Sequence, residues 1–182
     1  MKRRILTVPN LLSLLRLAMV PLFVWTYTVK HSDGATLAVL AASGLTDMLD
    51  GWIARRFDMV SDVGKLLDPI ADKVTQGVML ICLLARFPAM RIPLALLVVK
   101  ETLVGATNLA AMRRTGRVES ASMHGKVATC CLYGLFLIHL LWGDIPARVS
   151  NALVAVTSLS MACSLVLYVV HNLKRVRSAE GR

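Results

Sequence analysis

Apolar stretches of about 20 residues, the length that crosses a bilayer as a helix, alternate with short polar breaks along this chain. The breaks are rich in glycine, proline and charged residues, which interrupt such helices. The pattern therefore predicts six transmembrane helices, at roughly 8–29, 35–56, 64–85, 91–112, 123–142 and 146–173. A short basic segment at 1–7 precedes them, and we expect the basic tail at 174–182 to be frayed.

The composition favours the same fold class. Of the 182 residues 56% are hydrophobic, and the mean hydropathy is +0.64, which is too apolar for an ordinary soluble domain. We expect a single all-α integral membrane domain over residues 1–182. A basic start before an apolar run is also typical of a signal peptide. Pro9, Asn10 and Arg16 interrupt that run, however, which favours a retained first transmembrane helix.

The positive charge of the chain is arranged as membrane topology predicts. The net charge of +10 comes from short basic clusters between apolar stretches, and the chain has few aromatic residues. A surface that stacks nucleic-acid bases needs interleaved basic and aromatic residues, so we expect no nucleic-acid partner. Most Lys and Arg lie on the side of both termini. By the positive-inside rule that side is cytoplasmic, where the clusters also contact anionic membrane lipids.

Acidic residues are concentrated at the cytoplasmic ends of the second and third predicted helices. Six of the 11 acids of the chain lie there, namely Asp47, Asp50, Asp58, Asp62, Asp68 and Asp72. Carboxylates at membrane depth are rare and usually functional. Asp47 and Asp50 share one helix face at spacing i, i+3, and Asp68 and Asp72 share another at i, i+4. Such carboxylates need a cation between them, and Mg²⁺ prefers oxygen ligands of this kind.

The spacing D-x2-D-G-x2-A-R-x8-G-x3-D-x3-D, from Asp47 to Asp72, resembles the signature of the CDP-alcohol phosphatidyltransferases. Every fixed position of that signature is filled. Two further segments resemble the phosphatidylglycerophosphate and cardiolipin synthase branch of the family. They are Val8-Pro9-Asn10-Leu11-Leu12-x3-Arg16 and His124-Gly125-Lys126-Val127.

The resemblance implies a site for two divalent cations, Mg²⁺ or Mn²⁺, that hold a lipid diphosphate. The implied ligands are Asp47, Asp50, Asp68 and Asp72. Asp72 is also the implied catalytic residue, a general base for the acceptor hydroxyl. The alternative from the residues themselves is a structural network in which these acids pair with Lys65, Lys73 and Arg55.

The resemblance also assigns binding of the CDP-linked substrate. The implied residues are Asp50, Gly51, Ala54, Arg55, Gly64 and Asp68. Gly51 and Ala54 would leave space for the cytidine, although small residues equally serve close helix packing in membranes. Arg55 would grip the diphosphate with its forked guanidinium, or else satisfy the positive-inside rule.

The acceptor site is less defined by the sequence. A buried cation such as Arg16 should point toward a phosphate or an acidic partner. Lys126 and Arg113 are candidates for docking an anionic acceptor, and otherwise contact lipid headgroups. Many phosphatidylglycerophosphate synthases carry an arginine where this chain has Asn108. That departure keeps phosphatidylglycerol open as acceptor beside glycerol 3-phosphate.

Other polar residues receive no role from the sequence. Lys100 and Glu101 are adjacent within a predicted helix, so we expect them to face different directions and to find partners on other helices. We expect solvated or interfacial positions for Asp58, Asp62, His31, His139 and His171. The four cysteines, all in apolar stretches, are interpreted as small packing residues, without a disulfide or a metal.

The sequence thus predicts a six-helix membrane enzyme with a polar cavity open to the cytoplasm and the lipid. By resemblance it transfers the phosphatidyl group of CDP-diacylglycerol to glycerol 3-phosphate, or to phosphatidylglycerol, and releases CMP. Members of the family are commonly homodimers. A cation transporter is the rival from another class. It should show repeated or broken helices, and it leaves Gly51, Ala54, Arg55 and Gly64 unexplained.

Overall fold

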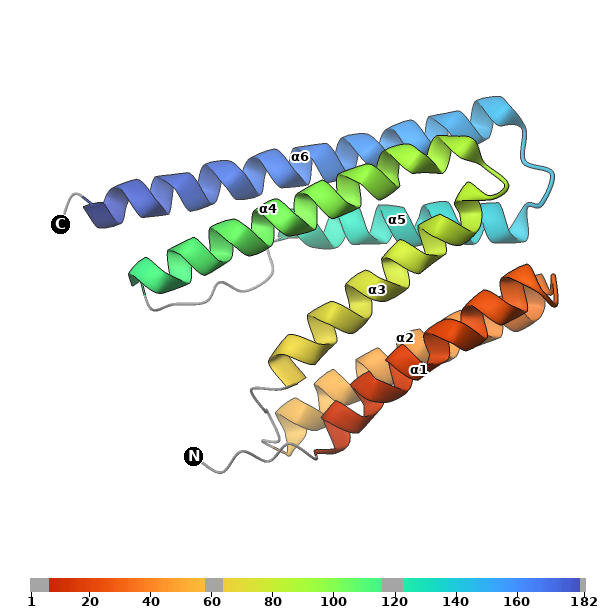
Figure 1. Cartoon of the computed structure of the whole chain (residues 1–182), viewed down its shortest axis with the longest axis horizontal. Coiled ribbons are helices and arrows are strands. Elements are labelled where there is room, and N and C mark those ends of the chain that lie inside the picture. Colours follow the sequence, from red (N-terminus) through yellow and green to blue (C-terminus); the bar gives the residue numbers. More distant parts are fainter. Residues whose placement is uncertain (1–6, 58–63, 116–122, 181–182) are drawn as a thin grey trace. The chain divides into compact units, whose positions relative to one another are not determined.

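The computed structural model describes residues 7–57, 64–115 and 123–180. Within these ranges the side chains of 55, 65–66, 107–115, 123–124 and 172–180 lie outside the description. The predicted acids Asp58 and Asp62 also fall outside it. All regular secondary structure in the described ranges is helical (Figure 1).

The helices begin and end close to the predicted positions. They are α1 (Val8–Thr28), α2 (Asp33–Arg56), α3 (Gly64–Leu84), α4 (Arg91–Thr115), α5 (Met123–Leu141) and α6 (Ala147–Glu180), with a short 3₁₀ turn η1 (Pro88–Met90) before α4. The expected fraying of the tail is wrong as far as Glu180, because α6 continues beyond its apolar part. Its Lys, Arg, Ala and Glu residues are good helix formers.

The chain divides into two compact units, Met1–Cys82 and Leu83–Arg182. The predicted organisation as one domain therefore stays a prediction. The first unit holds α1, α2 and nearly all of α3. The second holds α4, α5 and α6.

In the first unit, α1 and α2 lie side by side (Figure 1). The Thr7 hydroxyl caps α1 by accepting the N–H of Asn10 at 3.4 Å. The connection to α2 passes through His31, whose φ of 48° lies in the left-handed region. Beside it, the Thr36 hydroxyl donates to the Thr26 hydroxyl at 3.3 Å. These bonds define the start of α1 and hold α1 to α2 at their connection.

In the second unit, α6 packs against both α4 and α5 (Figure 1). The buried apolar residues of this unit include Leu132 and Phe136 of α5 and Val154 and Met161 of α6. His139 is also buried here, only 2% exposed. The expectation of a solvated or interfacial His139 is therefore wrong. Its neighbours in sequence are apolar, and it packs with them while its ring nitrogens are hydrogen-bonded.

Three helices in the described part of the chain are long and apolar enough to cross a membrane. They are α1, the Asp33–Ala54 part of α2 and the Ala147–His171 part of α6. The apolar part of α5, Gly125–Leu141, is shorter. Large apolar side chains such as Leu45, Trp52 and Leu159 remain exposed along these helices. These features indicate a helical membrane protein, and the count of six crossings stays a prediction.

Candidate active site

A buried polar stripe runs along the first turns of α1. Asn10, Ser13 and Arg16 are spaced by three residues, which places them on one helix face. All three are buried, and Arg16 is only 2% exposed. A buried guanidinium is unfavourable unless acidic groups surround it. The stripe therefore marks the face of α1 where the acids of the first unit should lie.

Arg16 is indeed surrounded by three of the four predicted aspartates. Its Nη2 lies 2.5 Å from Asp47 Oδ1 and 2.6 Å from Asp50 Oδ2. Its Nη1 lies 3.9 Å from Asp72 Oδ1. The side chain of Asp50 is 5% exposed, whereas those of Asp47 and Asp72 are 50% and 39% exposed. The carboxylates of Asp47 and Asp72 are thus accessible from outside the helices, whereas that of Asp50 is buried between them.

The fourth aspartate, Asp68, is held by α1 one turn away from Arg16. The fully buried Ser13 hydroxyl donates to Asp68 Oδ1 and also lies 3.1 Å from the Pro9 carbonyl oxygen. Asp68 is close enough to the other acids for its charge to act on both Asp50 and Asp72. The predicted pairs on α2 and α3 therefore meet against one face of α1.

Ser13 was missed by the sequence analysis. A serine in an apolar membrane helix usually bonds its own backbone, as Ser13 also does through Pro9. Its spacing of three residues from both Asn10 and Arg16 was the available signal, since polar residues on one face of an apolar helix share a polar environment.

The other residues predicted to bind the CDP-linked substrate lie on α2 and at the start of α3. Gly51 and Ala54 are half-buried on α2, next to Asp50, and Gly64 is buried at the first residue of α3. The side chain of Arg55 lies outside the described side chains. Their roles in binding the CDP group stay predictions.

The three acceptor candidates divide between the units. Arg16 belongs to the first unit, where its observed partners are aspartates. Lys126 is exposed on α5 of the second unit. Arg113 lies on α4, and its side chain is outside the described ones. Binding of an acceptor by any of them stays a prediction.

The expectation that Lys100 and Glu101 face apart without pairing is wrong, and partners for them on other helices stay a prediction. Lys100 Nζ lies 3.1 Å from Glu101 Oε1, so the adjacent residues pair directly. Their Cβ atoms point in different directions from the helix, but both side chains are long and flexible enough to meet. Lys100 is buried, and its ion pair explains how a cation is held inside the second unit.

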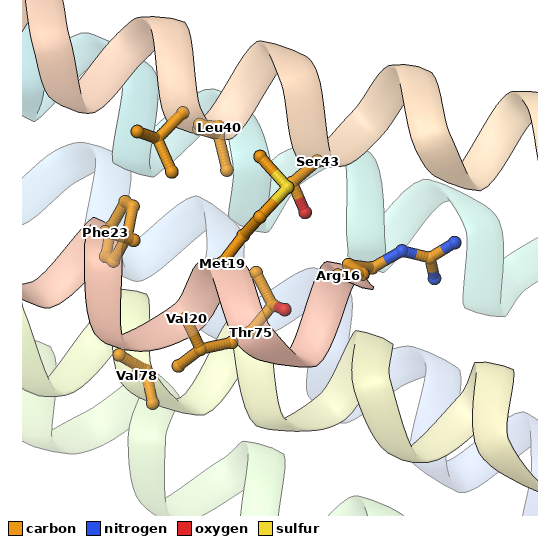
Figure 2. Close-up of a pocket in the computed structure, with 9 residues that line it drawn as sticks. Arg16, Met19, Val20, Phe23, Leu40, Ser43, Thr75 and Val78 are labelled. Carbon is orange, nitrogen blue, oxygen red and sulfur yellow. The ribbon is translucent and has the colours of Figure 1, made fainter. Parts of the chain in front are cut away.

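A narrow pocket lies beside the stem of Arg16, with room for little more than one water molecule. Figure 2 shows the guanidinium of Arg16 extending away from the apolar side chains of the pocket, such as Met19 and Phe23. Ser43 and Thr75 are the other polar residues of its lining. The predicted polar cavity is a different feature and stays a prediction.

The donors at this cluster fit a hard divalent cation. Four carboxylates from two helices offer only oxygen ligands, and three of them already surround one positive group. Among the described residues, however, no three acidic, histidine or cysteine side chains are arranged as a ready-made metal site. The carboxylates are arranged around Arg16 instead.

Residues 6–170 match the family model described as CDP-alcohol phosphatidyltransferase. The chain belongs to the CDP-alcohol phosphatidyltransferase family. The resemblance inferred from the aspartate spacing is therefore confirmed. The match also extends through both compact units, so the family pattern does not stop at the aspartate cluster of the first unit.

Curated relatives carry two kinds of name. A cardiolipin synthase (CMP-forming) from Streptomyces coelicolor is 51% identical over 76 residues, 39% of this chain and 35% of that protein. A CDP-diacylglycerol--glycerol-3-phosphate 3-phosphatidyltransferase from Rickettsia bellii is 40% identical over 100 residues, 53% of this chain and 54% of that protein. The chain thus spans about a third to a half of these relatives. Both named branches agree with the predicted one.

Proposed function

We propose that this family member transfers the phosphatidyl group of CDP-diacylglycerol to the hydroxyl of glycerol 3-phosphate and releases CMP. The observation that carries this proposal is the convergence of Asp47, Asp50 and Asp72 on one buried cation, with Asp68 beside them on Ser13. In a chain of this family, such a cluster is suited to a metal-held diphosphate.

The four aspartates would hold two divalent cations, Mg²⁺ or Mn²⁺. These supply neutralisation of the diphosphate charge and orientation of the leaving group. The buried Asp50 would act as a ligand only. Gly51 and Ala54 on the same helix would leave room for the cytidine, and Arg55 would bind a diphosphate oxygen through its forked guanidinium.

Asp72 would act as the general base. The acceptor hydroxyl gives its proton to a carboxylate oxygen of Asp72 and forms a bond to the lipid-linked phosphorus. The bond from that phosphorus to the CMP oxygen breaks in line, and CMP leaves with both bonding electrons. The partial exposure of the Asp72 side chain supports this role, because an acceptor must reach it.

A second candidate acceptor is phosphatidylglycerol, which would make the product cardiolipin. The 51% identity to the Streptomyces cardiolipin synthase favours it, as does Asn108 in place of an arginine. Glycerol 3-phosphate remains our first proposal because the match to the Rickettsia enzyme extends over more of the chain. Lys126 and Arg113 would then bind the acceptor phosphate.

Both termini and the aspartate cluster would face the cytoplasm, where a soluble nucleotide product can leave. The distribution of Lys and Arg supports this orientation. We also propose that the enzyme works as a homodimer, as the family resemblance implies. Exposed apolar side chains along the helices are compatible with contact to lipid or to a second copy.

The experiment is a product assay with purified protein in detergent micelles. CDP-diacylglycerol and Mg²⁺ or Mn²⁺ are supplied with labelled glycerol 3-phosphate or labelled phosphatidylglycerol, and CMP and lipid products are measured. We expect CMP release that needs both a metal and an acceptor, with phosphatidylglycerophosphate as the main product. Cardiolipin as the main product would select the second candidate. A cation transporter would release no CMP with either acceptor.

A further inference from the structure

Arg16 contacts carboxylate oxygens that could also bind an added cation. Its Nη2 lies 2.5 Å from Asp47 Oδ1 and 2.6 Å from Asp50 Oδ2, on oxygens of two proposed metal ligands. A bound Mg²⁺ sits about 2.1 Å from its oxygen ligands. A divalent cation held by these two oxygens and the Nη2 group therefore need the same space.

One guanidinium faces several carboxylates in this cluster. Asp47, Asp50 and Asp72 lie within 3.9 Å of Arg16, and Asp68 is held close by on Ser13. Carboxylates held this close to one another favour binding of more positive charge. Arg16 thus brings the acids together and leaves them able to bind a further cation.

The guanidinium itself is also incompletely bonded. Within the described residues, neither Nε nor Nη1 of Arg16 has a hydrogen-bond partner, although both are buried. Buried donors without partners are rare in proteins, so these two are available to a further partner. An anionic group such as a phosphate has the charge and the oxygen acceptors that these donors lack.

A small unfilled space adjoins the stem of Arg16. The narrow pocket beside its stem means that the stem is not tightly packed on that side (Figure 2). Its bonds to Asp47 and Asp50 of α2 are both made by the terminal Nη2 of the side chain.

We propose that Arg16 is an internal counter-cation, which holds the aspartates together before metal binds and which a divalent cation displaces. The displaced guanidinium then presents Nε and Nη1 to the phosphates of the substrate. Arg16 is in this sense a positioning residue for the metal and a binding residue for the phosphate. The inference rests on the proposed metal site and adds an exchange of cations at it.

The first test is metal affinity. Mn²⁺ binding to the purified protein is followed by the loss of the free Mn²⁺ signal in electron paramagnetic resonance, without substrate. In Arg16→Gln, Mn²⁺ does not have to break the charged hydrogen bonds that Arg16 makes to the aspartates. It should therefore bind this variant at least about tenfold more tightly than the wild type. Arg16→Lys keeps the charge and should stay near the wild type. Arg86→Gln removes the same charge from the other unit and should change nothing.

The second test follows the wild-type protein, and a variant serves only to assign one signal. The side chains of arginine are labelled with ¹⁵N, and the Nε–H signal of Arg16 is assigned through Arg16→Lys. Addition of Mg²⁺ should shift that signal, while the signal of Arg86 stays in place.

Three outcomes separate this inference from the proposed function. Tighter Mn²⁺ binding in Arg16→Gln, with a shifted Arg16 signal, supports the exchange. Equal or weaker Mn²⁺ binding in that variant, or an Arg16 signal that does not move at saturating metal, overturns it even if CMP is released normally. A wild-type protein that neither binds Mn²⁺ nor releases CMP overturns both.

Discussion

Each unit holds a buried polar network, and the one around His139 is more completely hydrogen-bonded than the one around Arg16. In the second unit, the His139 ring is fully bonded. Its Nδ1–H donates to the Leu135 carbonyl at 2.8 Å, and its Nε2 accepts the Ser150 hydroxyl at 2.9 Å. Because a carbonyl only accepts, this tautomer follows from the geometry. The pair joins α5 to α6.

In the first unit, Arg16 gathers three carboxylates, and two of its donors have no hydrogen-bond partner among the described residues. A complete buried network mainly stabilises a fold, whereas an incomplete one can take up a further ligand. The difference therefore favours a structural role for His139 and Ser150. It supports the ligand-binding role proposed for the cluster around Arg16.

The largest effect should come from Asp72→Asn. An amide cannot accept the acceptor's proton, so CMP release should fall by about 10²–10⁴-fold. Binding of CDP-diacylglycerol should remain largely intact, because the other aspartates are unchanged. Both are measured on the purified variant, by CMP release and by binding of labelled CDP-lipid. Near-normal CMP release would reject the role of Asp72 as base.

The second effect concerns stability rather than turnover. Ser150→Ala leaves the buried Nε2 of His139 without its donor, which should lower the free energy of unfolding by about 1–3 kcal/mol. Thermal unfolding in detergent measures this change, and CMP release per folded molecule should not alter. Ser164→Ala is the matched control on α6, since that buried hydroxyl has no partner among the described residues. Equal losses of unfolding free energy in both variants would contradict a structural role of the His139–Ser150 bond.

The ion pair of Lys100 and Glu101 should give a smaller effect. In a double-mutant cycle with Lys100→Met and Glu101→Gln, the two changes should show a coupling of about 1 kcal/mol in unfolding free energy. The reason is that the two side chains are in direct contact, and residues in contact couple when both are changed. Strictly additive single effects would mean that the 3.1 Å contact does not contribute to stability.

The smallest effect is expected for Asp144→Asn. Asp144 pairs with Arg86 at 3.7 Å, but its side chain is fully exposed, and exposed pairs contribute little. Neither the unfolding midpoint nor CMP release should change measurably. An activity loss comparable to that of Asp72→Asn would mean that acids of the second unit take part in the reaction.

The sequence predicted the helices and the acidic cluster well, for physical reasons. Apolar length and polar breaks determine where a membrane helix starts and stops, so α1 to α5 end within a few residues of the predicted positions. Helical spacing alone placed Asp47 with Asp50, and Asp68 with Asp72. Only the structure shows that both pairs lie against the same helix, α1.

What the sequence did not predict depended on partners distant along the chain. Ser13 meets Asp68 55 positions away, and His139 meets Ser150 on another helix. Lys100 and Glu101 were misjudged because the spacing rule follows Cβ directions and ignores how far long side chains reach. Arg16 was left open between a phosphate and an acidic partner. The structure supplies the acidic partner, and the phosphate stays a prediction.

The central claim is that the aspartate cluster holds divalent cations that contact the lipid diphosphate. Electron–nuclear double resonance of Mn²⁺ in the purified protein with bound CDP-diacylglycerol measures this contact directly. We predict a ³¹P coupling of phosphate bound to the metal, present in the wild type and lost in Asp50→Asn. Mn²⁺ that binds without any ³¹P coupling, or a coupling that survives in Asp50→Asn, would contradict the account.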